Sequence, residues 1–198
     1  MVNAIGISTT INELDTLYNS NPTQALYYSK LALLELCGWI EQTMDSIIKD
    51  CTNSKLTDSA NITFVEKQII DRTNGFHYGN HFRPMLMKLI GLIKLEQIEN
   101  TLKASGDLVV LTSQLGTLKT KRDQAAHTTI TGVTHVYDSP SIVRNYLNRI
   151  HPILTKIEAE LTTISSSGVV PKRGCIPILF LPFLGILIYF LLQNVFKH

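Results

Sequence analysis

Three residues that are able to take part in chemistry stand close together in this sequence: Arg122, Asp123 and His127. Histidine changes its charge near neutral pH, so it can accept or donate a proton. Asp123 lies one helical turn before His127, where a carboxylate can hold the imidazole in one orientation. If a helix ends at His127, its dipole favours the protonated imidazole. The spacing therefore predicts an oriented histidine close to an arginine.

Arg122 also has an unusual place in the apolar pattern of its own segment. Leucines at helical spacing predict the buried side of a helix: Leu108, Leu111, Leu115 and Leu118. The next position of this stripe is Arg122, followed by Ala125 or Ala126. Burying a guanidinium without a partner would cost several kcal/mol. We therefore expect Arg122 to line a cleft or a subunit interface.

Arg122 and His127 are five residues apart, which limits how they can work together. At about 100° per residue, they point about 140° away from each other on one straight helix. They cannot then both reach one substrate atom. Either the helix breaks at His127, or two copies of the chain contribute residues to a shared site.

The pattern Arg-polar-x-x-x-His at the end of a helix resembles the R-x(4–6)-H motif of HEPN domains, with Asp123 at the usual polar position. Two further stretches resemble segments of large bacterial HEPN groups: Glu-Leu-Cys-Gly-Trp-Ile-Glu-Gln at 35–42 and His-Phe-Arg-Pro-Met-Leu at 81–86. The resemblance covers roughly residues 20–164. It implies an all-helical homodimer whose two motifs face each other. Many members of the family are metal-independent endoribonucleases.

The resemblance also implies a role for each residue of the motif. The two His127 side chains would act as general base on the ribose 2′-hydroxyl and general acid on the leaving 5′-oxygen, which leaves a 2′,3′-cyclic phosphate. Arg122 would hold the phosphate, and Asp123 would orient His127. Lys119 and Lys121 could contact the RNA backbone, although such lysines more often form a solvated helix face.

No metal or cofactor is expected from the sequence. His77 and His81 stand four residues apart, but Gly79 and the turn around it favour loop and capping roles over a metal pair. The three cysteines lack metal-ligand spacing, and Cys37 falls on an apolar helical stripe, as a small buried thiol would. Charge is nearly balanced, with 18 basic and 16 acidic residues, so net charge alone does not indicate a nucleic-acid binder.

The segments that must position these residues are helical in their pattern, and none alternates as a strand would over a useful length. We expect a short helix over 8–17 and longer ones over 22–50, 62–73, 81–104, 108–127 and 141–164. They form an all-α, up-and-down helical bundle of about five helices. Asn21 is the expected N-cap of the first long helix, and Gly75 ends the next. Residues expected in the core include Leu33, Ile40, Ile47, Ile93 and Ile142.

The C-terminal segment has a different character. After a serine-rich stretch at 165–167, residues 176–192 carry no charged or strongly polar side chain. Seventeen helical residues span roughly 26 Å, and the residues that follow bring this near the roughly 30 Å of a hydrocarbon core. We expect a helical domain over 1–164, a linker over 165–174 and one C-terminal transmembrane helix over 175–198.

Charges around this span predict its orientation in the membrane. Lys172 and Arg173 precede it and only Lys197 follows it, which favours a cytoplasmic helical domain. The N-terminus shows no secretory signal. We expect a single-pass protein of a bacterial inner membrane. An apolar helix docked on the bundle is the competing interpretation, but such a helix would normally keep a polar side.

The family suggests a membrane-anchored toxin or phage-defence ribonuclease, and two other functions stay open. One is a non-catalytic HEPN-like binding or sensor module, in which a degenerate site binds without cutting or Arg122 and His127 are a buried charged pair that fixes packing. The other is an effector that disrupts the membrane through its span. The residues identify neither the RNA target nor an antitoxin or sensor partner.

Overall fold

The computed structural model describes residues 1–127 and 136–166, with the backbone alone for residues 127 and 164–166. Over these residues the chain is all-helical, as predicted. They belong to one compact unit, Met1–Ser167. In order, the elements are α1 (Ile5–Ser20), the 3₁₀ turn η1 (Pro22–Gln24), α2 (Ala25–Asn53), α3 (Ser59–Phe64), the π-helical turns η2 (Val65–Ile70) and η3 (Tyr78–Phe82), α4 (Arg83–Ala104), α5 (Asp107–His127) and α6 (Pro140–Ser166).

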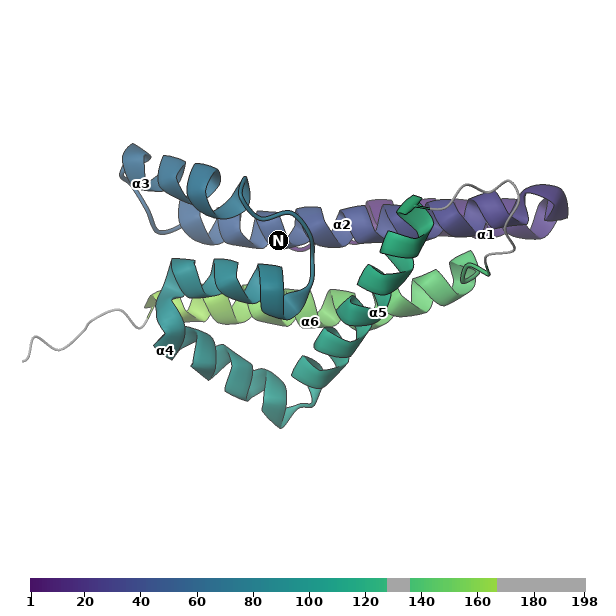
Figure 1. Cartoon of the computed structure of the whole chain (residues 1–198). Coiled ribbons are helices and arrows are strands. Elements are labelled where there is room, and N and C mark those ends of the chain that lie inside the picture. The colour runs from purple at the N-terminus through teal and green to yellow at the C-terminus, as the bar shows by residue number, and fades with distance from the viewer. Residues whose placement is uncertain (128–135, 167–198) are drawn as a thin grey trace, which may run out of the picture. The chain divides into compact units, whose positions relative to one another are not determined.

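The centre of the bundle is formed by α1, α2 and α6, because each of them packs against the other two. Figure 1 shows these three helices running along the same long direction, while α5 crosses them obliquely and α4 is bent in its middle. Besides α2, α4 and α6, helix α5 also packs against η3. This packing brings Arg122 and Asp123 on α5 close to His81 on η3.

The long helix α2 buries the seam that its seven-residue repeat predicts. Three members of the seam are at most 1 % exposed: Leu33, Ile40 and Ile47. The expected cap differs in detail, because the Asn21 side chain accepts a hydrogen bond from the Thr23 hydroxyl at 2.7 Å and caps no backbone N–H. Residues Pro22–Gln24 form a 3₁₀ turn, so α2 itself begins later and extends to Asn53.

Helix α4 is bent, whereas the apolar spacing suggested one straight helix. Gly91 has φ 78° and ψ 161°, a conformation that glycine adopts readily because it lacks a Cβ. The bend leaves Ile93 78 % exposed, so its expected place in the core is wrong. After the bend the helix returns to the core through Leu95, Ile98 and Leu102.

Helix α6 packs against α1 and α2 and shows a second difference from the predicted pattern. Its buried stripe is Val143, Leu147, Ile150, Leu154, Ile157 and Leu161. Ile142 is 44 % exposed, so its predicted core position is wrong. The reason is that the stripe begins one residue later, and one residue turns a side chain by about 100° around the helix.

Across residues 1–127 and 136–166, no helix is both long enough and apolar enough to cross a membrane. The predicted transmembrane helix, 175–198, lies outside the described residues. The same holds for the predicted linker from residue 167 onward.

Candidate functional site

Arg122 reaches the surface from the otherwise buried side of α5. Its side chain is 30 % exposed, whereas Leu118 and Ala125 on the same stripe are fully buried. Its guanidinium carbon lies 5.3 Å from the centre of the Phe76 ring, and that ring is buried. An aromatic face in this position attracts the cation and limits its movement. The aliphatic stem thus fills the stripe position while the charge stays outside the core.

Asp123 forms ion pairs with two cations of α5, Lys119 and Arg122. Its Oδ2 lies 2.6 Å from the Lys119 Nζ, and its Oδ1 accepts a hydrogen bond from the Arg122 Nε at 3.1 Å. The hydrogen bond from Lys119, with a smaller contribution from Arg122, lowers the pKa of the Asp123 carboxyl. Asp123 is therefore ionised at neutral pH and holds the guanidinium in one orientation.

His127 is the last residue of α5, and the backbone is helical from Asp107 to that point. Arg122 and His127 therefore lie on one continuous helix, about 140° apart around its axis. The side chain of His127 lies outside the described part of the chain, so its contact with Asp123 stays a prediction.

The two lysines that were candidates for RNA contacts each have an acidic partner. Lys119 is paired with Asp123, and the Lys121 Nζ lies 3.0 Å from the Asp138 Oδ2, just before α6. An RNA phosphate would have to compete with a carboxylate for either lysine. Their contact with RNA stays a prediction.

The turn between η2 and η3 lies beneath Arg122. The preceding helical segment ends at Ile70, so the prediction that it continues to residue 73 and is ended by Gly75 is wrong. Gly75, at φ 124°, lies in the turn that follows and donates its N–H to the Glu41 carboxylate. Phe76 follows at once and supplies the ring that contacts the guanidinium. His77 has the expected capping role, because its side chain accepts a hydrogen bond from the backbone N–H three residues later.

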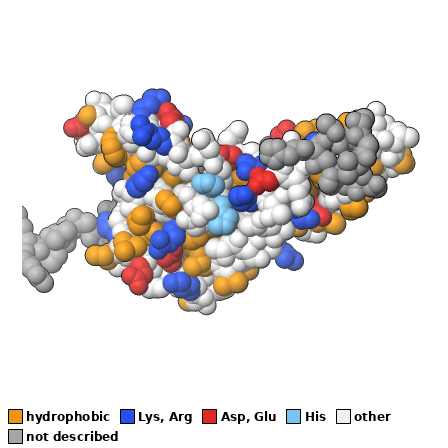
Figure 2. Space-filling model, in the orientation of Figure 1, with side chains coloured by type: hydrophobic (Ala, Val, Ile, Leu, Met, Phe, Trp, Pro, Cys, Tyr) orange, Lys and Arg blue, Asp and Glu red, His pale blue; other side chains and the backbone are white. Residues whose placement is uncertain are grey.

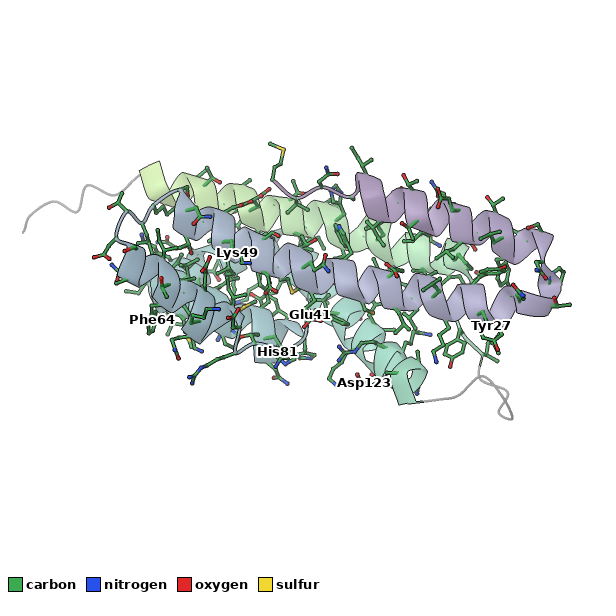
Figure 3. All side chains as sticks on the ribbon, turned by 90° about the horizontal axis from the view of Figure 1, so that it is seen from above. Tyr27, Glu41, Lys49, Phe64, His81 and Asp123 are labelled. Atoms are coloured by element: carbon green, nitrogen blue, oxygen red, sulfur yellow. The ribbon has the colours of Figure 1, made fainter. Side chains whose placement is uncertain are left out.

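His81 is a site residue whose place at the site the sequence pattern did not show. Figure 3 labels Glu41, His81 and Asp123 along one edge of the bundle, where they come from α2, η3 and α5. Figure 2 shows histidine atoms beside basic and acidic side chains on the visible face. The spacing of His77 and His81 around a glycine indicated a turn. Only the packing of η3 on α5 brings this turn to Arg122.

A buried polar cluster holds the start of η3 in place. The Tyr78 hydroxyl donates to the Glu99 Oε1 at 2.9 Å, and the Arg83 Nε donates to the same oxygen at 2.7 Å. Burial acts to raise the pKa of Glu99, but the hydrogen bonds from Arg83 and Tyr78 outweigh it, so the pKa is lowered. The carboxylate thus stays charged although it is only 6 % exposed, and it ties η3 to the second half of α4.

The chemistry available at the site is that of cations, imidazoles and carboxylates. Burial raises the pKa of the Cys37 thiol to about 12, and the charge of Arg122, which acts to lower this pKa, has a smaller effect. Cys37 is therefore not a nucleophile at neutral pH. In the described part of the chain, no three His, Cys, Asp or Glu side chains are grouped so that they could hold a metal ion. These groups can bind an anion and transfer protons.

Comparison with known proteins adds no relative: no family model, no curated protein and no solved structure matches this chain. The resemblance to HEPN domains therefore rests on the chain's own residues and on its helical pattern.

Proposed function

We propose that the chain is a metal-independent endoribonuclease of the HEPN type, which works as a homodimer and is tethered to a membrane. The observation that carries the proposal is the position of the Arg122 guanidinium. It is held between Asp123 and the Phe76 ring, at the point where the buried stripe of α5 reaches the surface. A fixed guanidinium can bind a phosphate with little loss of conformational entropy. His127, the candidate for proton transfer, lies on the same helix.

In the proposed reaction the RNA supplies both the nucleophile and the bond that breaks. One His127 imidazole takes the proton of the ribose 2′-hydroxyl, the 2′-oxygen attacks the phosphorus, and the bond to the 5′-oxygen breaks. A second, protonated His127 donates a proton to that 5′-oxygen. Arg122 offsets the negative charge that grows on the non-bridging oxygens. The products are a 2′,3′-cyclic phosphate and a 5′-hydroxyl.

Dimerisation is part of the proposal because one α5 helix cannot aim both motif residues at one phosphate. If two α5 helices pair about a two-fold axis, Arg122 of one protomer can meet His127 of its partner. Sedimentation tests this arrangement. Protein that is monomeric at concentrations where it cleaves RNA would contradict the composite site.

The tether is proposed for residues 175–198, behind a linker over 165–174, with the helical domain on the cytoplasmic side of a bacterial inner membrane. Its support is the charge-free run 176–192 and the basic pair before it. This position would suit a toxin or a phage-defence effector. The full chain should remain with membranes after carbonate extraction, whereas a chain ending at Gly168 should be released.

A non-catalytic binding module is the second candidate, and the ion pairs of the site favour it. Lys119 and Lys121, which a nuclease could turn towards RNA, already have carboxylate partners. Such a bundle would bind a partner protein or a nucleotide at the membrane without cutting RNA.

Sequencing of cellular RNA ends separates these candidates. Cells that express the wild type should accumulate new 2′,3′-cyclic phosphate ends, and cells with equal amounts of His127→Ala in their membranes should not. Equal ends in both strains, or none in either, would exclude the nuclease and leave the binding module. Membrane depolarisation without RNA loss would indicate an effector that disrupts the membrane.

A further inference from the structure

The proposed reaction gives no role to His81, although its ring is held firmly at the site. The residue belongs to η3, which packs against α5. Its Nδ1 accepts a hydrogen bond from the backbone N–H of His77 at 3.0 Å. The ring also lies against Gly75, where a Cβ would come within 2.7 Å of the imidazole Cε1. A residue larger than glycine at position 75 would therefore displace the ring.

The hydrogen bond at Nδ1 decides which ring nitrogen of His81 carries the proton. A neutral imidazole has one N–H, so an Nδ1 that accepts leaves the proton on Nε2. Burial lowers the pKa of His81, and nearby side chains add to this effect: His77, Arg122 and Lys119. Glu41 acts in the opposite direction without outweighing them. At pH 7 the ring is therefore mostly neutral and offers a hydrogen-bond donor at Nε2.

Two consecutive residues connect this ring to the guanidinium. The imidazole lies on Gly75, and the ring of the next residue, Phe76, lies beneath Arg122. Asp123 occupies the Nε and Nη2 side of the guanidinium, with 3.0 Å between Nη2 and Oδ1. Because a guanidinium has five N–H donors, its other side can meet a ligand while Asp123 stays in place.

We propose that His81 and Arg122 of the same chain form a binding site for a tetrahedral oxyanion, with the His81 Nε2–H and the guanidinium as donors. In the proposed function this anion is an RNA phosphate, and to that extent the site rests on that function. His81 binds and does not transfer protons, because its accepting nitrogen already holds the His77 N–H. Proton transfer is left to His127.

Binding of inorganic phosphate to the full-length protein in detergent tests this site. In His81→Asn the amide oxygen can replace Nδ1 as acceptor for the His77 N–H, but no donor replaces Nε2–H. In His81→Gln the longer side chain brings an amide N–H near the Nε2 position. We expect phosphate affinity to fall about tenfold or more in His81→Asn and in Arg122→Ala, and to recover in part in His81→Gln.

A matched control is His151→Asn, since His151 lies beside Trp39 in another part of the bundle and its loss should leave phosphate affinity unchanged. Nitrogen NMR of the wild-type imidazoles provides a readout that needs no variant. His81 should carry its proton on Nε2, and this resonance should move when phosphate is added. A proton on Nδ1, or wild-type phosphate affinity in His81→Asn, would overturn the proposal. If phosphate binds as expected but the wild type cleaves no RNA, the anion site stands and the nuclease does not.

Discussion

The guanidinium of Arg122 lies over the ring of Phe76, with 5.3 Å between the guanidinium carbon and the ring centre. Phe76 is 1 % exposed and belongs to the turn that also carries Gly75 and His77. The same ring therefore fills the core with one face and supports the cation with the other. Core packing and the position of the proposed phosphate-binding charge are thus coupled through one side chain.

Phe76→Leu should separate these two roles, because leucine keeps an apolar side chain in the core but removes the aromatic face. We expect the free energy of unfolding to fall by about 1–2 kcal/mol, and RNA cleavage to fall further than this loss explains. Ile150→Val in the core of α6 is the control, with a cost of about 1 kcal/mol and unchanged cleavage. Denaturant unfolding and cleavage rates of the two variants test this. Equal cleavage by both would show that the ring does not support Arg122.

Glu99→Ala should be one of the most damaging single changes in the bundle. It leaves the Tyr78 hydroxyl buried without its acceptor and Arg83 without its carboxylate, so we expect a loss of about 2–4 kcal/mol. Glu96→Ala, at an exposed position of the same helix, should change stability by about 0.5 kcal/mol or less. Urea unfolding of the two variants makes the comparison. Similar midpoints would mean that the buried cluster does not hold η3.

The two glycines Gly91 and Gly116 should respond to alanine in opposite directions. A Cβ at either position would meet no atom within 4 Å, so only the backbone distinguishes them. Gly91 has φ 78°, and Gly91→Ala should therefore lose about 1 kcal/mol. Gly116 lies within α5, and Gly116→Ala should gain about 0.5–1 kcal/mol. A higher thermal midpoint for Gly91→Ala than for the wild type would be evidence against the bend in α4.

Asp45 on α2 provides a pH-dependent prediction. Burial, with a smaller effect of Glu41, raises the pKa of Asp45 from 3.8 to about 6. The native state then binds this proton more tightly than the unfolded state, so stability falls as pH rises through this interval. Asp45→Asn should be more stable than the wild type at pH 8 by about 1 kcal/mol, because partial exposure to solvent weakens the effect of the raised pKa. This gain in stability should vanish near pH 4. Thermal unfolding at several pH values tests this, with the exposed Glu66→Gln as control. A gain that is equal at both pH values would contradict the raised pKa.

The helices were predictable because their signal is local: apolar residues such as Leu33 and Ile40 repeat at a spacing that only a helix places on one side. Ile93 shows the limit of this signal, since Gly91 interrupts the helix and a period cannot continue through a residue outside helical geometry. Arg122 could be found because it interrupts an apolar stripe. The place of His81 could not, because its nearness to Arg122 arises when η3 packs on α5, and no spacing along the chain encodes that contact.

Whether Arg122 and His127 together cut RNA is tested most directly with purified full-length protein in detergent and excess EDTA. The measurement is the rate of RNA cleavage by the wild type, by Arg122→Ala, by His127→Ala and by mixed dimers of the two variants. We predict cleavage by the wild type, none by either variant alone, and weak residual activity in the mixed dimer, which retains one Arg122 but only one of the two His127 side chains that the reaction uses. Cleavage by His127→Ala at the wild-type rate would contradict the ribonuclease function, and loss of wild-type cleavage in EDTA would contradict a metal-independent reaction.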